Sequence, residues 1–158
     1  MPASPDSIDR TMLRELARDA RISHVALAKA AGLSPTACAR RLAQLERVGF
    51  IRNYSADIDA AMLGYMITAM VRITLERQNE TTLVAFEKAI MRCPDVVTCH
   101  LMSGSDDYLV QVQARDMEDY ERIHKQHLSR LPGVMRLSSS FAMRSIVKRT
   151  ISPSALAQ

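Results

Sequence analysis

The chain has 158 residues, of which 47% are hydrophobic and 24% charged, as in a folded protein of one usual-sized domain or two small ones. No apolar run approaches the roughly 20 residues that span a bilayer, and the N-terminus shows no secretory signal, so we expect no membrane association and no export. Three cysteines at unrelated spacings argue against a disulfide scaffold and for a reducing, cytoplasmic location.

The net charge of +4 is concentrated at one end of the chain. Residues 1–55 contain nine Lys/Arg and five Asp/Glu, whereas residues 56–158 contain twelve of each. Because phosphate neutralisation supplies most non-specific affinity for DNA, the N-terminal end is the candidate contact surface. A chance imbalance of charge is the alternative.

Three short helices are predicted at this end. Apolar residues at helical spacing predict the first over residues 8–20 and the second over residues 24–31. A tight turn at Gly32 follows, and Ser34 can then cap a third helix over residues 35–48. This order predicts a helix-turn-helix, in which the second helix of the pair enters the major groove of DNA.

The third predicted helix has two different faces. Its apolar face carries Cys38, Leu42, Leu45 and Val48. The other face is cationic and bears amide and hydroxyl groups, a combination that fits a major groove. The alternative is an ordinary amphipathic surface helix whose charges are merely solvated. If the helix binds DNA, the expected contacts are Ser34, Thr36, Arg40, Arg41, Gln44, Arg47 and Arg52.

These candidates differ in role. Hydroxyls and free backbone N–H groups at the helix N-terminus suit a phosphate. Arg40 and Gln44 can reach base edges, the arginine toward guanine and the glutamine toward adenine. Arg41 lies nearer the packed side, so it contacts phosphate or pairs with Glu46. Arg47 and Arg52 are expected backbone contacts.

The next stretch, residues 50–58, is apolar-aromatic and strand-like, and could form a wing or a strand that joins two domains. We expect a DNA-binding domain at residues 1–55, a hinge at residues 56–64 and a second domain at residues 65–158.

The rest of the chain alternates between strand and helix periods. The predicted order is strand 66–76, helix 79–93, strand 97–103, strand 108–114, helix 116–131 and strand 137–147. This βαββαβ order predicts an α+β, ferredoxin-like sandwich with two helices on one face of an antiparallel sheet. The other face needs a cover, and a partner subunit is suggested there by Met66, Thr68, Met70, Val110 and Val112.

Two sets of residues occur in order along the chain: first Leu33-Ser34-Pro35-Thr36, Arg41, Leu45-Glu46, Gly49-Phe50-Ile51 and Tyr54, then Gly104-x-x-Asp107-Tyr108, Leu131-Pro132-Gly133-Val134 and Lys148. The first set resembles the winged helix-turn-helix of the Lrp/AsnC (leucine-responsive, feast/famine) regulators. The second resembles the ligand-sensing RAM domain of the same family. The resemblance covers about residues 8–151, nearly the whole chain.

The resemblance implies a cytoplasmic transcription regulator that binds double-stranded DNA and takes an amino acid as effector. It also implies a homodimer built through the RAM sheets and often assembled into octamers. Two departures stand out. Ala43 and Gln44 occupy positions where many members carry basic residues, and the loop Gly104-Ser105-Asp106-Asp107-Tyr108 lacks the first aspartate and the aromatic residue of the usual pattern.

The turn at Gly104 is the candidate effector site. Glycine lets a backbone approach a small ligand closely, exposed amides could hold an α-carboxylate, and Asp106 or Asp107 could hold an α-ammonium. The alternative is a plain hairpin turn, for which this sequence is suitable. The expected effector contacts are Met102, Gly104, Ser105, Asp106, Asp107, Tyr108 and Ser139.

Other function classes are less well supported. No nucleophile, base and orienting group stand out together, so we expect no enzyme. Cys99 and His100 point to opposite faces of a strand, and we expect no metal and no cofactor beyond the effector. A nucleoid-like architectural protein with little sequence specificity is the remaining alternative, because the third helix is only weakly charged.

Overall fold

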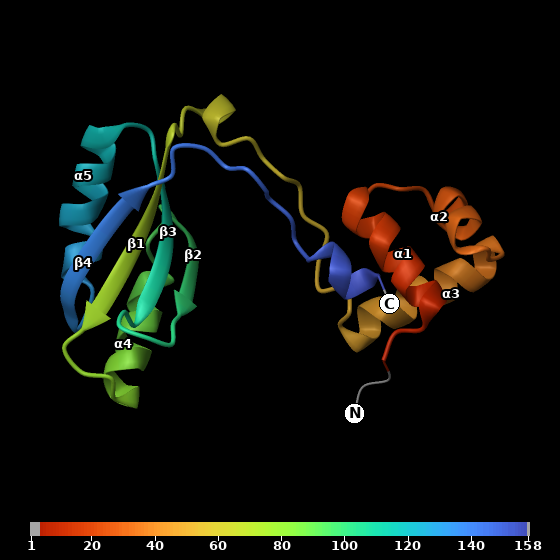
Figure 1. Cartoon of the computed structure of the whole chain (residues 1–158), viewed down its shortest axis with the longest axis horizontal. Coiled ribbons are helices and arrows are strands. Elements are labelled where there is room, and N and C mark those ends of the chain that lie inside the picture. Colours follow the sequence, from red (N-terminus) through yellow and green to blue (C-terminus); the bar gives the residue numbers. More distant parts are fainter. Residues whose placement is uncertain (1–3, 158) are drawn as a thin grey trace. The chain divides into compact units, whose positions relative to one another are not determined.

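The computed structural model describes residues 4–157, and their contacts divide the chain into two units. The helical unit contains residues 4–57 and 147–157, and the sheet unit contains residues 58–146. The expected second domain, residues 65–158, differs from this division because the C-terminal segment packs with the helical unit. Figure 1 labels the main helices and strands. None of the described helices is long and apolar enough to cross a membrane.

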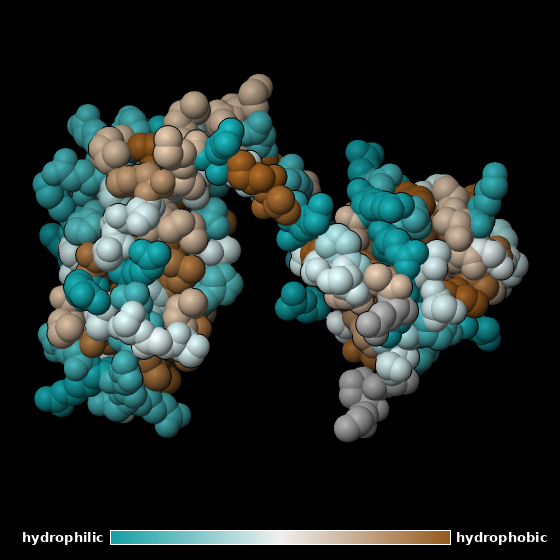
Figure 2. Space-filling view, viewed as in Figure 1, coloured by the Kyte–Doolittle hydropathy of each residue, from teal (hydrophilic) through white to brown (hydrophobic). Residues whose placement is uncertain are grey.

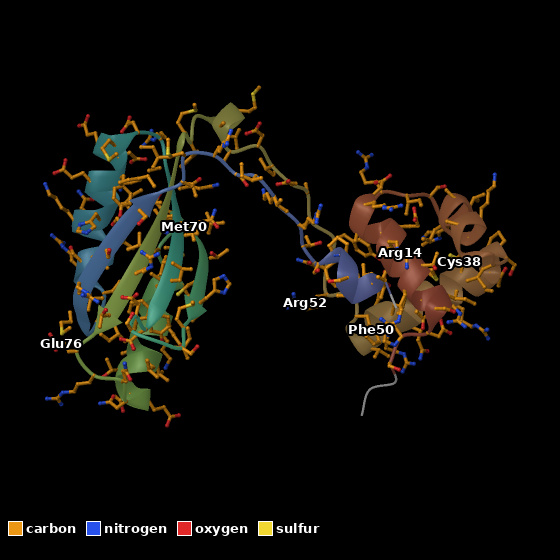
Figure 3. All side chains as sticks on the ribbon, in the orientation of Figure 1. Arg14, Cys38, Phe50, Arg52, Met70 and Glu76 are labelled. Atoms are coloured by element: carbon orange, nitrogen blue, oxygen red, sulfur yellow. The ribbon has the colours of Figure 1, made fainter. Side chains whose placement is uncertain are left out.

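The helical unit has three helices: α1 (Ser7–Arg18), α2 (His24–Ala31) and α3 (Pro35–Val48). Gly32 closes α2 with a φ of 67°, a left-handed conformation that favours glycine and turns the chain toward α3. All three helices contribute to one core of Met12, Leu27, Ala28, Cys38, Leu42 and Leu45. Cys38 is fully buried there (Figure 3). The helix-turn-helix is therefore confirmed.

The segment after α3 differs from the prediction, because residues 50–58 form no strand. A strand requires a neighbour for its backbone hydrogen bonds, and no described strand pairs with this segment. Two hydrogen bonds hold the segment to α3 instead: the Ile51 N–H donates to the Leu45 carbonyl at 3.3 Å, and the Tyr54 hydroxyl donates to Glu46 Oε1 at 2.8 Å.

The sheet unit has four antiparallel strands in the order β2-β3-β1-β4, and two helices: β1 (Ile67–Leu75), α4 (Glu80–Ile90), β2 (Val96–Leu101), β3 (Tyr108–Ala114), α5 (Met117–Gln126) and β4 (Val134–Phe141). The alternating burial of β1 and β3 shows that one face of the sheet is covered by the helices. This is the predicted ferredoxin-like fold, and its core contains Ala69, Val71, Ile73, Phe86, Tyr108, Val110, Val112, Tyr120 and Ile123.

The open face, defined as the face of the sheet turned away from α4 and α5, has a different composition from the one expected. Val110 and Val112 are completely buried on the helix side and so are wrong as residues of the open face. Pairing with the core residues of β1 fixes their direction, since Val110 lies opposite Val71. Thr68 and Met70 do lie on the open face, where both are half-buried.

Strand β4 is shorter than predicted because its partner ends. Phe141 pairs with Ala69, and one further hydrogen bond joins Ala142 N–H to the Thr68 carbonyl. β1 begins at Ile67, so nothing remains to pair with the alternating residues that follow, and Met143 is fully exposed. An alternating pattern alone therefore overestimates the length of a strand that has only one neighbour.

Candidate functional site

The N-terminus of α3 is capped by its own residues, which leaves few backbone donors for a ligand. The Ser34 side chain accepts a hydrogen bond from Ala37 N–H at 3.3 Å, and Pro35 occupies the first helical position. Thr36 is exposed beside them. In the first turn, only the Thr36 N–H lacks a partner among the described residues; together with the positive end of the helix dipole it favours an anion such as a phosphate.

The exposed face of α3 carries a row of polar side chains at helical spacing. Thr36, Arg40, Gln44 and Arg47 are all exposed. Arg47 donates from Nη2 to Gln44 Oε1 at 3.0 Å, which holds these two side chains together. Within residues 4–157, no ion pair or side-chain hydrogen bond is formed by Arg40. Its guanidinium is therefore available to a ligand of the helix.

Arg41 has partners of its own. Its Nη1 lies 2.7 Å from Asp6 Oδ2 and 2.8 Å from Asp9 Oδ1, so the side chain ties α3 to the start of α1. These hydrogen bonds raise the pKa of Arg41. The pKa of Asp6 is lowered, first by the Asp9 N–H and then by Arg41. The alternative partner Glu46 is engaged by Tyr54, whose pKa is raised to about 12 by burial and by that carboxylate.

The charge asymmetry is sharper in the structure than along the sequence. The helical unit has eleven Lys/Arg and six Asp/Glu, an excess of five positive charges, whereas the sheet unit has ten and eleven. The difference arises because the C-terminal segment adds Lys148 and Arg149 to the helical unit. Arg52, labelled in Figure 3, is exposed beyond the end of α3.

The second candidate site is the loop between β2 and β3. Gly104 has a φ of 133°, which a side chain rarely adopts, so glycine is favoured there. The loop is closed by a hydrogen bond from Met102 N–H to the Asp107 carbonyl at 2.8 Å. Met102, Gly104 and Ser105 are exposed, so their backbone and side-chain groups are accessible to a small molecule.

Asp107 is used inside the protein. It is only 6% exposed, and its carboxylate accepts the Leu75 N–H at 2.7 Å. Its own N–H donates to the Ile73 carbonyl at 2.8 Å. These bonds attach the loop to the end of β1, and the carboxylate is a support of the loop rather than an open ligand for an ammonium group.

Tyr108 and Ser139 also face the helix layer. Tyr108 is 1% exposed, stacks on Phe86 with ring centroids 4.3 Å apart and donates to Glu87 Oε1 at 2.9 Å. Burial, together with Glu87, raises the pKa of Tyr108. The Ser139 hydroxyl is 2.5 Å from the Tyr120 hydroxyl. Neither side chain therefore reaches the open face of the sheet within its own chain.

Asp106 lies in a polar cluster on the open face that the sequence did not reveal. Its Oδ1 is 3.4 Å from Arg136 Nη2 of β4 and 3.5 Å from Thr74 Oγ1 of β1. The Arg136 guanidinium also lies 3.4 Å from the Thr74 hydroxyl. Neighbouring residues of a strand point to opposite faces, so the position of Arg136 next to the inward-facing Leu137 could have predicted that Arg136 lies on the open face. Its proximity to Asp106 follows only from the strand register, in which Thr74 pairs with Arg136.

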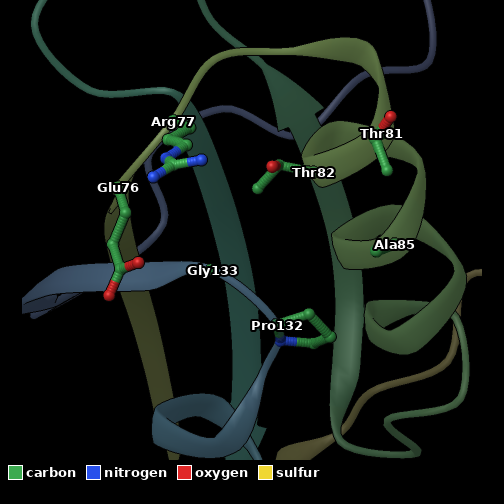
Figure 4. A pocket seen from close by; sticks show the side chains of 7 residues that line it. All are labelled: Glu76, Arg77, Thr81, Thr82, Ala85, Pro132 and Gly133. Carbon is green, nitrogen blue, oxygen red and sulfur yellow. The ribbon is translucent and has the colours of Figure 1, made fainter.

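A separate hollow of about 220 Å³ lies between the end of β1, α4 and the turn before β4 (Figure 4). It is lined by Glu76, Arg77, Thr81, Thr82, Ala85, Pro132 and Gly133. A Cβ on Gly133 would stand 2.6 Å from Thr82 Cγ2, so glycine permits this turn to approach α4. The residues predicted as effector contacts do not line the hollow.

Two family models match the chain. The AsnC-type helix-turn-helix domain matches residues 6–46, and the Lrp/AsnC ligand binding domain matches residues 68–152. The second match ends within the C-terminal segment that packs with the helical unit.

Individual proteins agree with these matches. An uncharacterized HTH-type transcriptional regulator of Sinorhizobium fredii is 44% identical over 73% of this chain and 91% of its own. The leucine-responsive regulatory protein of Escherichia coli K12 is 42% identical over 82% of this chain and 79% of its own. Among solved structures, a Neisseria meningitidis transcriptional regulator in complex with L-Met has a TM-score of 0.89 at 29% identity, covering 95% of this chain and 97% of its own. An AsnC family regulator of Agrobacterium tumefaciens has a TM-score of 0.89 at 32% identity, covering 97% and 99%.

Proposed function

Because this chain belongs to the Lrp/AsnC family of transcriptional regulators, we propose that α3 reads specific DNA sequences and that an amino acid bound to the sheet unit alters this binding. The observation that carries the DNA part is the row of exposed side chains on α3, in the unit that holds all the excess positive charge. As a regulator of chromosomal genes, the protein would act in the cytoplasm.

Within α3, we assign base reading to Arg40 and Gln44. The Arg40 guanidinium has no side-chain partner among the described residues, and it suits the two acceptors of guanine in the major groove. Gln44 is held by Arg47, and its amide can still present a donor and an acceptor to adenine. Ser34 and Thr36 are assigned to phosphate contacts at the helix N-terminus. Arg52 is assigned to the DNA backbone, whereas Arg41 is assigned to the support of α3.

The two adjacent arginines provide a matched test of this assignment. Arg40→Ala and Arg41→Ala each remove one positive charge from α3, but only Arg40 is free to read a base. Arg40→Ala should lower affinity for a DNA site selected from a random pool by about 10-fold or more, given roughly 1–3 kcal/mol for a good base contact. Its affinity for random DNA should change much less.

Arg41→Ala should change both DNA affinities by the same factor and lower the thermal stability of the protein, because it leaves Asp6 and Asp9 without their cation. Fluorescence anisotropy with both DNAs at two salt concentrations measures these effects. Equal loss of selected and random binding in the Arg40 variant would reject base reading. Wild-type protein that shows no preference at either salt concentration would instead support the architectural alternative.

For the effector, we propose an α-amino acid bound at the cluster of Asp106, Thr74 and Arg136. A zwitterion offers a carboxylate to the guanidinium and an ammonium to the Asp106 carboxylate, each as a charge-assisted hydrogen bond. The two protein groups already pair with each other at 3.4 Å, so the ligand would exchange one ion pair for two. The exposed backbone of Gly104 and Ser105 and the half-exposed Met102 would complete the site. The L-Met bound by the Neisseria relative supports an amino acid as the ligand class.

A thermal-shift screen against the twenty amino acids tests the effector proposal, since a ligand that prefers the native state must raise its unfolding temperature. At least one amino acid should stabilise the wild-type protein, and Asp106→Ala should abolish that shift. Glu118→Ala removes an equally negative, exposed carboxylate from α5 and should retain it. Full retention of the shift in the Asp106 variant would move the effector site elsewhere.

We further propose that the chain acts as a homodimer joined through the open face of the sheet and that such dimers assemble into octamers. No described helix covers this face, and the segment that leads into β1 carries several large hydrophobic residues that are exposed in the single chain: Ile58, Met62, Leu63 and Met66. Figure 2 shows hydrophobic residues in brown among the hydrophilic surface. A bound amino acid can alter DNA binding only by preferring one assembly or conformation over another.

A further inference from the structure

The end of the chain folds back onto the DNA-binding helices. Residues 153–156 form a short 3-10 helix, η3, which contacts α1. Leu156 is only 6% exposed. The burial of this apolar side chain removes it from water and indicates that the segment is docked.

Two arginines of α1 hold this segment through its backbone. Arg14 Nη2 donates to the Leu156 carbonyl at 2.7 Å, and Arg10 Nη1 lies 3.4 Å from the Ala155 carbonyl. The two side chains are four residues apart and therefore lie on one side of α1. Figure 3 labels Arg14 on this helix. Charged donors aimed at backbone carbonyls recognise the path of the segment rather than its side chains.

The core of the helical unit does not depend on this contact. Its buried residues come from α1, α2 and α3, and Leu156 is outside that cluster. The segment also carries Lys148, which forms an exposed ion pair with Asp57 after α3. Docking is therefore added to a unit with its own core, which allows the segment to dock and release without unfolding the helices.

The docked segment changes how the two units are connected. Residues 49–66 lead from α3 into β1, and residues 142–152 lead from β4 back to η3. When the C-terminal segment is docked, two segments connect the helical unit to the sheet unit: residues 49–66 and residues 142–152. A body with two tethers has fewer accessible orientations than one with a single flexible tether.

We propose that the C-terminal segment, residues 147–157, is a strap that transmits the state of the sheet unit to the DNA-binding helices by docking on α1. β4, which continues into the strap, carries Arg136 of the proposed effector site, so this link to the effector rests on the proposed function. A ligand that shifts β4 would act on α1 through the strap as well as through residues 49–66. After release of the strap, the protein would still bind DNA and the effector, but the effector would no longer alter DNA binding.

Two variants release the strap by different means. Leu156→Asp places a charge at a buried position, and Arg14→Met removes the shorter of the two hydrogen bonds to the segment while keeping an unbranched side chain suited to a helix. Arg18→Met is the control, because its guanidinium lies on the same helix and pairs, among the described residues, with the nearby Glu15 alone. All three are made in the full-length chain.

The first measurement is the distribution of distances between spin labels at Lys29 and Lys125, exposed positions of α2 and α5, introduced as an unnatural amino acid to spare the native cysteines. The labelled protein is diluted with an excess of unlabelled protein so that only distances within one chain are seen. We expect this distribution to broaden by about twofold in both strap variants and to stay unchanged in the Arg18 variant. An unchanged width in both strap variants would overturn the proposal.

The second measurement separates coupling from binding. Both strap variants should keep the wild-type helical circular dichroism, DNA affinity within about threefold and the amino-acid thermal shift, yet lose at least half of the effector-induced change in DNA affinity. Loss of helical signal in both variants would show that the segment is part of the core and would overturn the strap. If no amino acid affects the wild-type protein, the proposed effector fails, and the label distances still decide whether the strap restrains the helices.

Discussion

Neighbouring residues of the same type have different tasks in this chain, and their partners decide the difference. Arg40 is exposed on α3, whereas Arg41 pairs with Asp6 and Asp9. Asp106 lies beside Arg136 on the open face, whereas Asp107 is buried and accepts the Leu75 N–H. Helical spacing already predicted that Arg41 and Arg40 lie on different sides of α3. Asp106 and Asp107 lie in an irregular loop, where no periodic pattern predicts which of the two is buried.

The burial of Asp107 leads to a prediction about stability. Asp107→Ala should lower the free energy of unfolding by roughly 1–3 kcal/mol, because the Leu75 N–H would be buried without an acceptor. Urea unfolding followed by circular dichroism measures the change. Asp107→Asn keeps an acceptor oxygen and should lose much less, and Asp106→Ala should be close to wild type. Wild-type stability of Asp107→Ala would show that the loop does not depend on this bond.

At the level of secondary-structure elements, the starts of the helices follow from local chemistry, whereas α4 and α5 end at Ile90 and Gln126, before the predicted residues 93 and 131, and the ends of the strands depend on their neighbours. α3 runs over Pro35–Val48, as predicted, between the caps Ser34 and Gly49, because capping acts over a few neighbouring residues. β2 shows the contrary case. A register shift after Val96 makes this residue pack on the core and leaves Val97 50% exposed, whereas simple alternation with the core-packed Cys99 would place Val97 inward. Bulges depend on the neighbouring strand, which a local pattern does not contain.

The first turn of α5 predicts a pH dependence of stability. Asp119 accepts hydrogen bonds from the Arg115 N–H at 3.0 Å and from Arg122 at 2.8 Å, and these lower its pKa to about 2, the backbone donor contributing most. Because the pKa is lower in the folded than in the unfolded chain, the stabilisation is fully present above about pH 4 and is lost as the pH falls toward 2.

Urea midpoints at pH 5 and pH 2.5 measure this contribution. The wild-type protein should lose more stability over this interval than Asp119→Asn, whose amide does not titrate. Other carboxylates titrate in the same range in both proteins, so the difference between the two is the informative quantity. Equal pH dependence of the two proteins would contradict the assignment.

At the level of the whole molecule, the open face of the sheet predicts self-association. Multi-angle light scattering should give at least twice the chain mass of 17.6 kDa. Met70→Glu places a charge at a half-buried position of this face and should shift the mass toward that of one chain. Met91→Glu is the control, because Met91 is 77% exposed at the end of α4. A monomeric wild-type protein, or equal effects of both substitutions, would reject the proposed interface.

The sequence by itself determined the order of the elements, the helix-turn-helix, the ferredoxin-like class and the family, because periodicity, caps and turn residues are local properties that repeat along the chain. The tertiary structure decided which residues meet across long separations: Arg41 with Asp6, Asp106 with Arg136, and Leu156 with α1. It also moved the C-terminal segment from the sheet unit to the helical unit. Such contacts depend on strand register and on the path of the chain between distant elements, and neither has a local signal in the sequence.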